Sequence, residues 1–193
     1  MLLATLYNNK KSFTEDIQLW EQLVAEDRHA FSALFRKYYR PLVNYGLKLI
    51  PDEALVKDSI QELFFTIWEQ RKNLSEVEYV RSYLYISLRR TVLRQAEIQD
   101  SRSQRDRAYT EEAFREMVNE EQLMMIDELQ QEQKAQLREA LDALSEREKE
   151  AVFLKFYSGL ANAEIARVMK VSKQSVYNYI YRAIQALKAL LDG

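Results

Sequence analysis

The chain contains very few of the residues that interrupt regular backbone structure. Glycine occurs three times and proline twice in 193 residues, whereas sheets and hairpins need frequent turn residues of these types. The rest of the sequence is rich in Leu, Ala, Glu, Gln, Lys and Arg, which favour helices. Hydrophobic residues make up 47% of the chain, so buried cores can form. This composition predicts an all-α fold.

The sequence also bears on the compartment. Cysteine is absent, which excludes disulfide bonds and thiolate metal sites and is typical of a reducing environment. No apolar run approaches the ~18 residues of a membrane-spanning helix. The opening residues MLLATLYNN are too few and too polar for a signal peptide. We therefore expect a soluble, cytoplasmic protein.

Hydrophobic periodicity divides the chain into three parts. Residues 13–95 carry apolar side chains at spacings of three and four and predict a helical bundle. Residues 96–136 predict a linker, because their first half is almost free of apolar residues, while their second half has helical spacing. Residues 137–193 predict a second bundle. The expected architecture is therefore two small helical bundles joined by a partly helical linker.

Charge is distributed unevenly over these parts. Between residues 96 and 133 there are eleven acidic and four basic residues, whereas residues 29–95 and 134–193 each carry net positive charge. Two basic modules on either side of an acidic connector favour binding to anionic partners. The alternative is that charge simply varies along a highly charged helical chain.

The C-terminal part has the spacing of a helix-turn-helix. Gly159 is expected to end one helix and Asn162 to cap the next, and Ser172 is expected to cap a second helix after a short turn. Apolar residues of this second helix should face the core, which leaves polar residues on its other side. The candidate DNA-contacting residues there are Ser172, Lys173, Gln174, Ser175, Tyr177, Asn178 and Arg182.

These side chains suit the major groove of DNA. Gln and Asn pair with adenine there, and Lys and Arg bind guanine or phosphate. For any one of the residues the alternative is an ordinary solvated position. The capping, spacing and positive charge of the whole motif favour DNA binding.

Both halves of the chain resemble one family. The first half contains, in order, AFSALFRKYYRPLVNYGLKL, ALVKDSIQELFFTIWEQRKNL and VRSYLYISLRRTVLRQ, which resemble region 2 of bacterial RNA polymerase sigma factors. The stretch that begins LDALSEREKEAV and includes the helix-turn-helix resembles region 4. Without a third domain between them, the chain is most similar to the extracytoplasmic-function class of the sigma-70 family, in a variant abundant in the Bacteroides group.

The resemblance implies a role for each module. The helix with DSIQELFFTIW would dock on the largest subunit of core RNA polymerase through Asp58, Gln61 and Glu62. The next helix would bind the −10 promoter element through Arg81, Tyr83, Tyr85, Arg89, Arg90 and Arg94. Unpaired bases can stack on tyrosine while arginines hold the backbone. The helix-turn-helix would read the −35 element. The implied partners are core RNA polymerase, promoter DNA and an anti-sigma factor, with no cofactor and no small-molecule substrate.

The chain departs from the family's pattern at three positions. Arg90 stands where the family often has asparagine, and Tyr83 stands where it often has tryptophan. Lys170 occupies a turn position usually held by glycine, where a left-handed backbone would carry a small strain.

Other functions are alternatives to the one that the resemblance implies, among them a protein-binding adaptor, which would lack any dependence on DNA. An enzyme is not expected, because the single histidine, His29, is isolated and the chain has neither cysteine nor a glycine-rich phosphate loop. No catalytic residue or metal ligand is therefore predicted. The alternative is a free-standing helix-turn-helix transcriptional regulator, which would explain residues 137–193 but not the ordered motifs of the first half.

Overall fold

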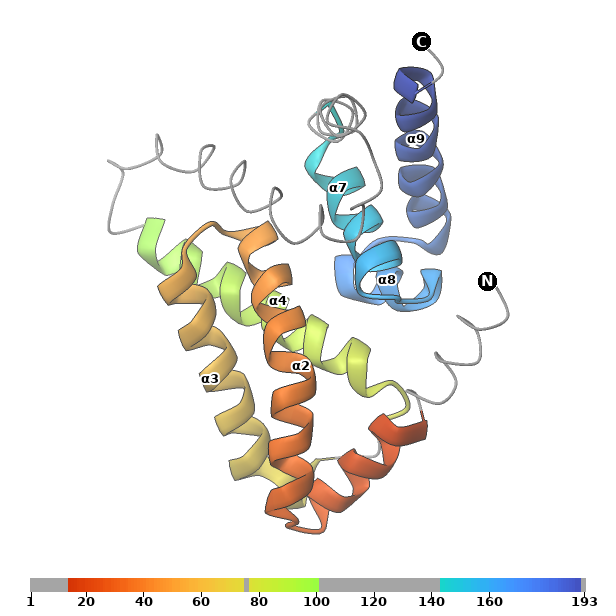
Figure 1. The fold of residues 1–193 in the computed structure, drawn as a ribbon. Helices are drawn as coiled ribbons and strands as arrows, with labels where there is room; N and C mark the ends of the chain where they lie inside the picture. Colours follow the sequence, from red (N-terminus) through yellow and green to blue (C-terminus); the bar gives the residue numbers. More distant parts are fainter. Residues whose placement is uncertain (1–13, 75–76, 101–142, 192–193) are drawn as a thin grey trace. The chain divides into compact units, whose positions relative to one another are not determined.

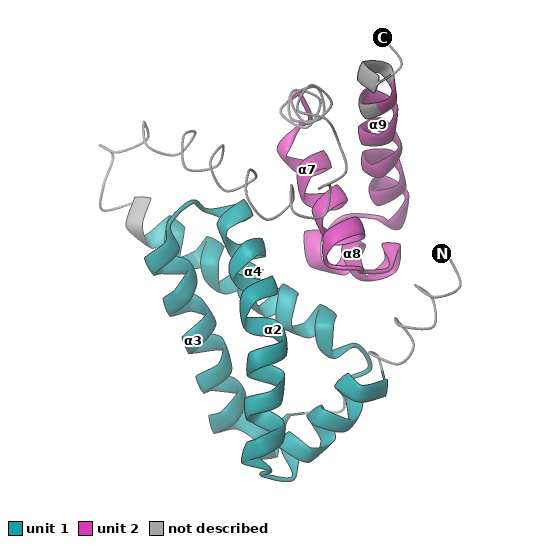
Figure 2. Cartoon of the chain, viewed as in Figure 1, with its two compact units in different colours: residues 1–104 teal, residues 105–193 magenta. Residues whose placement is uncertain are grey.

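The computed structural model describes residues 14–74, 77–100 and 143–191. In this part of the chain all regular structure is helical, so the all-α prediction is confirmed there (Figure 1). The chain divides into two compact units, Met1–Gln104 and Arg105–Gly193 (Figure 2). Most of the expected linker, residues 101–136, lies outside the described residues, as does the expected start of the second bundle.

The described residues of the first unit form a bundle of four helices. A helix over residues 14–24 is followed by α2 (Arg28–Leu49), α3 (Glu53–Gln70) and α4 (Val80–Asp100). A single 3-10 turn, η1 (Arg71–Asn73), follows α3. Figure 1 shows α2 beside α3 with α4 crossing both. The fully buried residues with the largest side chains are Leu23, Leu34, Leu42, Tyr45, Ile60, Ile67, Leu84, Tyr85 and Leu88.

Side-chain caps begin two of these helices. The Asp27 carboxylate accepts a hydrogen bond from the backbone N–H of His29 at 2.7 Å, and the Asp52 carboxylate accepts one from the N–H of Leu55 at 2.9 Å. Each bond satisfies a backbone donor that the first turn of a helix leaves without a partner. The caps therefore determine where α2 and α3 begin.

Glycine permits the close approach of α2 and α3. A Cβ atom at Gly46 would lie 2.5 Å from Cγ1 of Val56, which is fully buried in α3. Carbon atoms pack at about 3.5–4.0 Å, so a larger residue here would push the two helices apart.

Two helices run further than the sequence indicated. Proline inside a helix often bends or breaks it, but α2 continues past Pro41 without a break. Buried Tyr38 and Leu42, which are 4% and 0% exposed, pack on the core on either side of the proline and hold the helix together. The last helix of the bundle was expected to end near residue 95, but α4 reaches Asp100. The proposed linker boundary at residue 96 therefore falls inside a helix.

The second unit contains α7 (Glu146–Val152), a π-helical turn η3 (Phe153–Tyr157), α8 (Asn162–Met169) and α9 (Lys173–Leu191). Both α7 and α8 pack against α9. The most deeply buried residues of this unit are Ala151, Leu154, Leu160, Ile165, Val168, Met169, Val176 and Ala183. The expected helix-turn-helix is formed by α8 and α9.

A capping box begins α7. The carboxylate of Glu148 accepts hydrogen bonds from the backbone N–H and the hydroxyl of Ser145, at 2.9 and 2.7 Å, and the Glu148 N–H bonds back to the hydroxyl. The bond from the Ser145 side chain lowers the pKa of Glu148 below its usual value. This reciprocal pair also fixes where the second unit's first described helix starts.

The start of α8 differs from the expectation that Asn162 caps it. Asn162 is the first residue of the helix, and Ala161 holds the cap position. Alanine has no side-chain acceptor, so only one half of the capping interaction forms: the Glu164 carboxylate accepts the N–H of Ala161 at 2.8 Å.

The turn between α8 and α9 has the strained backbone that the sequence indicated. Lys170 has φ 54° and ψ 49°, in the left-handed region. The next N–H, that of Val171, reaches back to the carbonyl of Ala166 at 3.0 Å, which closes the end of α8. Ser172 then caps α9, since its hydroxyl accepts the N–H of Ser175 at 3.0 Å, as expected.

Candidate protein and nucleic-acid interfaces

One face of α9 is exposed and carries no negative charge. Val176, Ile180 and Ala183 are 0–9% exposed and hold the helix to its unit. The exposed residues on the other side are Lys173, Gln174, Tyr177, Asn178, Tyr181, Arg182, Gln185 and Lys188. The helix sequence from Lys173 to Leu191 contains no Asp or Glu. The sequence-predicted residues of this helix are therefore together on one cationic, amide-rich surface.

Two of the amide side chains are bonded to each other. The Gln174 Nε2 atom donates to the Asn178 Oδ1 atom at 3.1 Å, across one turn of the helix. The hydroxyls of Ser172 and Ser175 lie 2.8 Å apart and take part in the cap of α9. The two serines thus have a structural role, whereas the amides present further donors and acceptors outward.

Tyr181 was not among the candidate residues, although it is 64% exposed. It lies four residues after Tyr177 and seven after Gln174, so all three share one side of the helix. The helix-turn-helix therefore presents two tyrosine rings next to its amides and cations.

The six candidates on α4 do not form one surface. Tyr85 is a correction: it is 1% exposed and its ring packs on Tyr45, with centroids 5.0 Å apart. It belongs to the core of the first unit and is not available to bases. Arg81 and Arg89 are half-buried and already have interactions within the protein.

The remaining three candidates share a face of α4. Tyr83, Arg90 and Arg94 are spaced by seven and four residues, which places them on one side of the helix. Arg90 and Arg94 are exposed, and half-buried Tyr83 packs edge-on against Trp20, with centroids 5.1 Å apart. The helix over residues 14–24 thus supports the start of this face.

A buried carboxylate fastens that supporting helix to α2. Asp16, which is 3% exposed, accepts a hydrogen bond from the Tyr38 hydroxyl at 2.5 Å, and its other oxygen lies 2.9 Å from the Lys37 ammonium. Burial, together with the negative charge of Asp16, raises the pKa of Tyr38. Partial burial works to lower the pKa of Lys37, but its bonds to Glu15 and Asp16 outweigh this and raise it. A buried charge paired in this way holds two helices in a fixed arrangement.

The three candidates on α3 are exposed, as the sequence indicated. Asp58, Gln61 and Glu62 lie on the outer side of the helix, away from buried Ile60 and Leu63. They form an acidic and amide surface that can bind a basic or polar partner.

Glu62 also connects α3 to α4. Its carboxylate accepts hydrogen bonds from Arg94 at 3.0 Å and from the Gln95 amide at 2.7 Å. The Ser59 hydroxyl donates to the other end of the same Gln95 amide at 2.8 Å. A candidate for protein binding and a candidate for DNA binding are thus ion-paired with each other.

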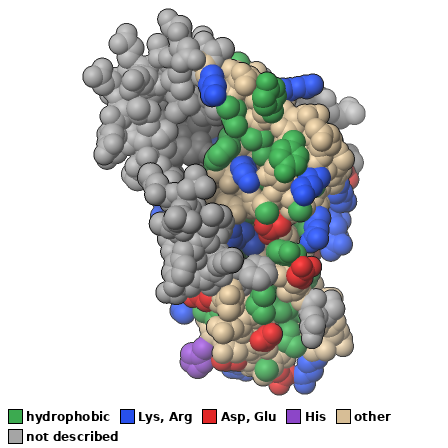
Figure 3. Space-filling model, turned by 90° about the vertical axis from the view of Figure 1, so that its right-hand side faces the viewer, with side chains coloured by type: hydrophobic (Ala, Val, Ile, Leu, Met, Phe, Trp, Pro, Cys, Tyr) green, Lys and Arg blue, Asp and Glu red, His purple; other side chains and the backbone are tan. Residues whose placement is uncertain are grey.

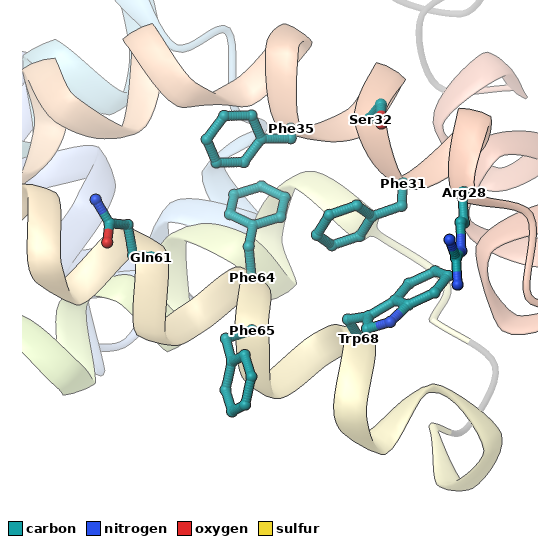
Figure 4. A pocket seen from close by; sticks show the side chains of 8 residues that line it. All are labelled: Arg28, Phe31, Ser32, Phe35, Gln61, Phe64, Phe65 and Trp68. Carbon is teal, nitrogen blue, oxygen red and sulfur yellow. The ribbon is translucent and has the colours of Figure 1, made fainter.

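An aromatic groove lies beside Gln61. It has a volume of about 520 Å³, and Figure 4 shows rings from α2 and α3 facing one another, with Phe65 projecting from α3. The lining residues are Arg28, Phe31, Ser32, Phe35, Gln61, Phe64, Phe65 and Trp68. Phe65 is 66% exposed. Sequence reasoning missed the groove, because it forms only when α2 and α3 pack together.

The described residues contain no group of three His, Cys, Asp or Glu side chains placed to hold a metal ion. No helix among them is long and apolar enough to cross a membrane.

Family models match both units. Residues 34–102 match sigma-70 region 2, and residues 134–187 match sigma-70 region 4. RNA polymerase sigma factor SigZ of Bacillus subtilis is 23% identical over 160 residues, which are 83% of this chain and 86% of that protein. RNA polymerase sigma-H factor of Pseudomonas aeruginosa is 25% identical over 186 residues, which are 92% of this chain and 94% of that protein.

Solved structures show the same fold. One is CnrH in complex with the cytosolic domain of CnrY, with a TM-score of 0.59 and 19% identity over 92% of this chain and 97% of that chain. Another is the sigma factor RpoE in complex with the anti-sigma factor NepR from Bartonella quintana, with a TM-score of 0.55 and 16% identity over 84% of this chain and 96% of that chain.

Proposed function

Because the chain belongs to the extracytoplasmic-function class of the sigma-70 family, we propose that it binds core RNA polymerase in the cytoplasm, directs it to promoters and helps to open them. The main observation in support of this proposal is the exposed face of α9, which is cationic, free of acidic residues and rich in amides. A helix of this kind, presented by a helix-turn-helix, can enter the major groove. The first unit supplies the other two surfaces that promoter opening requires.

The α9 face would read the −35 element. Residues in the first turns of a recognition helix reach base edges, and residues further along meet phosphates. Lys173, Gln174 and Asn178 therefore carry sequence recognition, and Arg182 and Lys188 add affinity. Ser172 and Ser175 fix the start of the helix that inserts into the groove.

The α4 face would bind the −10 element as strands separate. Tyr83 offers a ring for an unpaired base, and Arg90 and Arg94 attract the backbone. Arg81 and Arg89 would support this face from its half-buried side. Tyr85 has no direct part in it, because its ring lies in the core.

The α3 surface would dock on core polymerase. Asp58, Gln61 and Glu62 provide its polar part. Gln61 also lines the aromatic groove, so the groove is part of the same surface. Exposed Phe65 would be an anchor for the partner. Interface anchors are typically aromatic residues beside a pocket.

A negative regulator is also part of the proposal. The structural neighbour RpoE is bound to an anti-sigma factor, and a protein of this kind would compete with polymerase for the same surfaces. We therefore propose an anti-sigma factor as a third partner, besides polymerase and promoter DNA.

Transcription in vitro tests the proposed function. Core polymerase with this protein should initiate at discrete sites of its host's DNA, and core polymerase alone should not. A free-standing regulator would instead bind duplex DNA without core enzyme and would not co-purify with it. Equal site-specific initiation without the protein would overturn the proposal.

A further inference from the structure

Two tyrosine rings stand among the polar residues of the α9 face. Tyr177 is 51% exposed and Tyr181 is 64% exposed. They are four residues apart, so their rings neighbour each other on the helix surface. Figure 3 shows hydrophobic side chains interspersed with lysine and arginine side chains on the upper part of the view, which is the unit that contains α9. Together the two rings form a small apolar patch on an otherwise polar surface.

Packing among the described residues of the second unit does not account for these rings. The core side of α9 is filled by Val176, Ile180 and Ala183, which are 0–9% exposed. Both tyrosines point to the opposite side, where the neighbouring residues are Gln174, Asn178 and Arg182. Their position on the DNA-facing side suggests a contact with DNA.

The major groove offers one apolar group for such a contact. An A·T pair presents the adenine N6 and N7 atoms and the 5-methyl group of thymine, whereas a G·C pair has no methyl group there. Amide side chains pair with adenine, and apolar side chains contact the thymine methyl. The α9 face carries both kinds of side chain next to one another.

We propose that Tyr177 and Tyr181 contact thymine 5-methyl groups in the −35 element, beside adenines read by Gln174 and Asn178. Tyr181 lies on the same side of the helix as Gln174, two turns later, so a ring and an amide reach successive parts of the groove. The 3.1 Å bond between Gln174 and Asn178 orients both amides before DNA binds. A tyrosine ring has two rotatable bonds, so fixing it costs little conformational entropy.

Contact of the tyrosine hydroxyls with phosphate is the competing role. Phosphates already have partners on this helix in Lys173, Arg182 and Lys188, and no carboxylate opposes them. The apolar thymine methyl has no other partner of matching chemistry among the exposed residues of the face. The ring, more than the hydroxyl, is therefore the functional part of each side chain.

The test uses the protein reconstituted with core RNA polymerase. Promoter libraries first define the −35 element that the parent protein selects. Each thymine of that element is then replaced by deoxyuridine, which removes the methyl group and nothing else. We expect at least one position where the parent binds deoxyuridine DNA about fourfold more weakly, since one buried methylene contributes ~0.8 kcal/mol.

Variants of the tyrosines assign this sensitivity to a ring. Tyr181→Ala and Tyr177→Ala should weaken binding to thymine DNA, and at least one should bind thymine and deoxyuridine DNA equally at the sensitive position. Tyr181→Phe and Tyr177→Phe keep the ring and should keep the discrimination. Phe156→Ala is the matched control, because it removes a ring that is 61% exposed in the same unit but lies outside α9. Its discrimination should equal that of the parent.

Two results would overturn the proposal. One is equal binding of thymine and deoxyuridine DNA by the parent at every upstream position. The other is discrimination that survives in both alanine variants. Because this role rests on the proposed function, a parent holoenzyme that selects no −35 sequence would overturn both, whereas selection without methyl sensitivity would overturn the tyrosine role alone.

Discussion

The backbone conformation of Lys170 is energetically unfavourable for any residue that has a Cβ atom. Its φ of 54° lies in the left-handed region, which is unfavourable by roughly 1–2 kcal/mol for residues other than glycine, asparagine and aspartate. The hydrogen bond from Val171 to Ala166 holds the chain in this geometry. The strain therefore belongs to the turn that sets α9 against α8.

Replacement of Lys170 by glycine should relieve that strain. We expect Lys170→Gly to raise the free energy of unfolding of the second unit by about 1 kcal/mol, because glycine adopts the left-handed region without cost from a Cβ atom. Urea denaturation of the full chain, followed by circular dichroism, measures the change. Lys170→Ala is the control, since alanine keeps the Cβ atom and should leave stability within about 0.5 kcal/mol of the parent. Equal stability of the two variants would contradict the strain.

Tyr83 and Tyr85 illustrate what the sequence could reveal of single residues. Residues two positions apart point to different sides of a helix, so only one of the two rings could face outward. The choice depends on packing partners from distant segments, namely Tyr45 beneath Tyr85 and Trp20 beside Tyr83. The sequence alone supplied the helix but not these partners.

The sequence predicted the helices themselves more accurately than it predicted where they end. The spacing of apolar residues predicted the helices, and the capping chemistry of Ser172 predicted the start of α9 correctly. The predicted end of α4 near residue 95 was wrong, because a helix can continue through a polar sequence when no glycine or proline stops it. Gln95, bonded to both Ser59 and Glu62, also holds that end of the helix against α3. The aromatic groove likewise needed the packing of α2 on α3.

The contact between α2 and α3 can be tested at Gly46. Gly46→Ala should lower the free energy of unfolding by about 1 kcal/mol, because overpacking a core costs typically 1–3 kcal/mol and outweighs the better helix propensity of alanine. Val56, whose Cγ1 would lie 2.5 Å from the new Cβ, is β-branched and stiff. Thermal or urea denaturation measures the effect.

The control for this prediction is the same substitution made in a second variant of the protein. In a Val56→Ala protein the obstructing methyl groups are absent, so Gly46→Ala should be neutral or stabilising there, by up to about 1 kcal/mol. The sign of the effect should therefore change between the two backgrounds. An equal loss of stability in both would show that Gly46 is needed for a reason other than its close approach to Val56.

At the scale of the molecule, surfaces for different partners share side chains. Glu62 belongs to the proposed polymerase-docking surface on α3, and its carboxylate is ion-paired with Arg94 of the proposed −10 face on α4. The two side chains are 45% and 59% exposed, so the pair contributes little to stability and can exchange partners. If polymerase binds Glu62 as proposed, Arg94 would become available to the DNA backbone.

This exchange predicts a gain of DNA binding in the protein without polymerase. Glu62→Ala should bind a single-stranded −10 oligonucleotide about 1.4- to 5-fold more tightly than the parent, because an exposed pair worth about 0.2–1 kcal/mol no longer competes for Arg94. Asp58→Ala is the matched control, since it removes one negative charge from the same surface but not the partner of Arg94. Fluorescence anisotropy at low salt measures both. Equal gains in the two variants would mean that net charge alone raises affinity, and the proposed exchange between polymerase and DNA would be wrong.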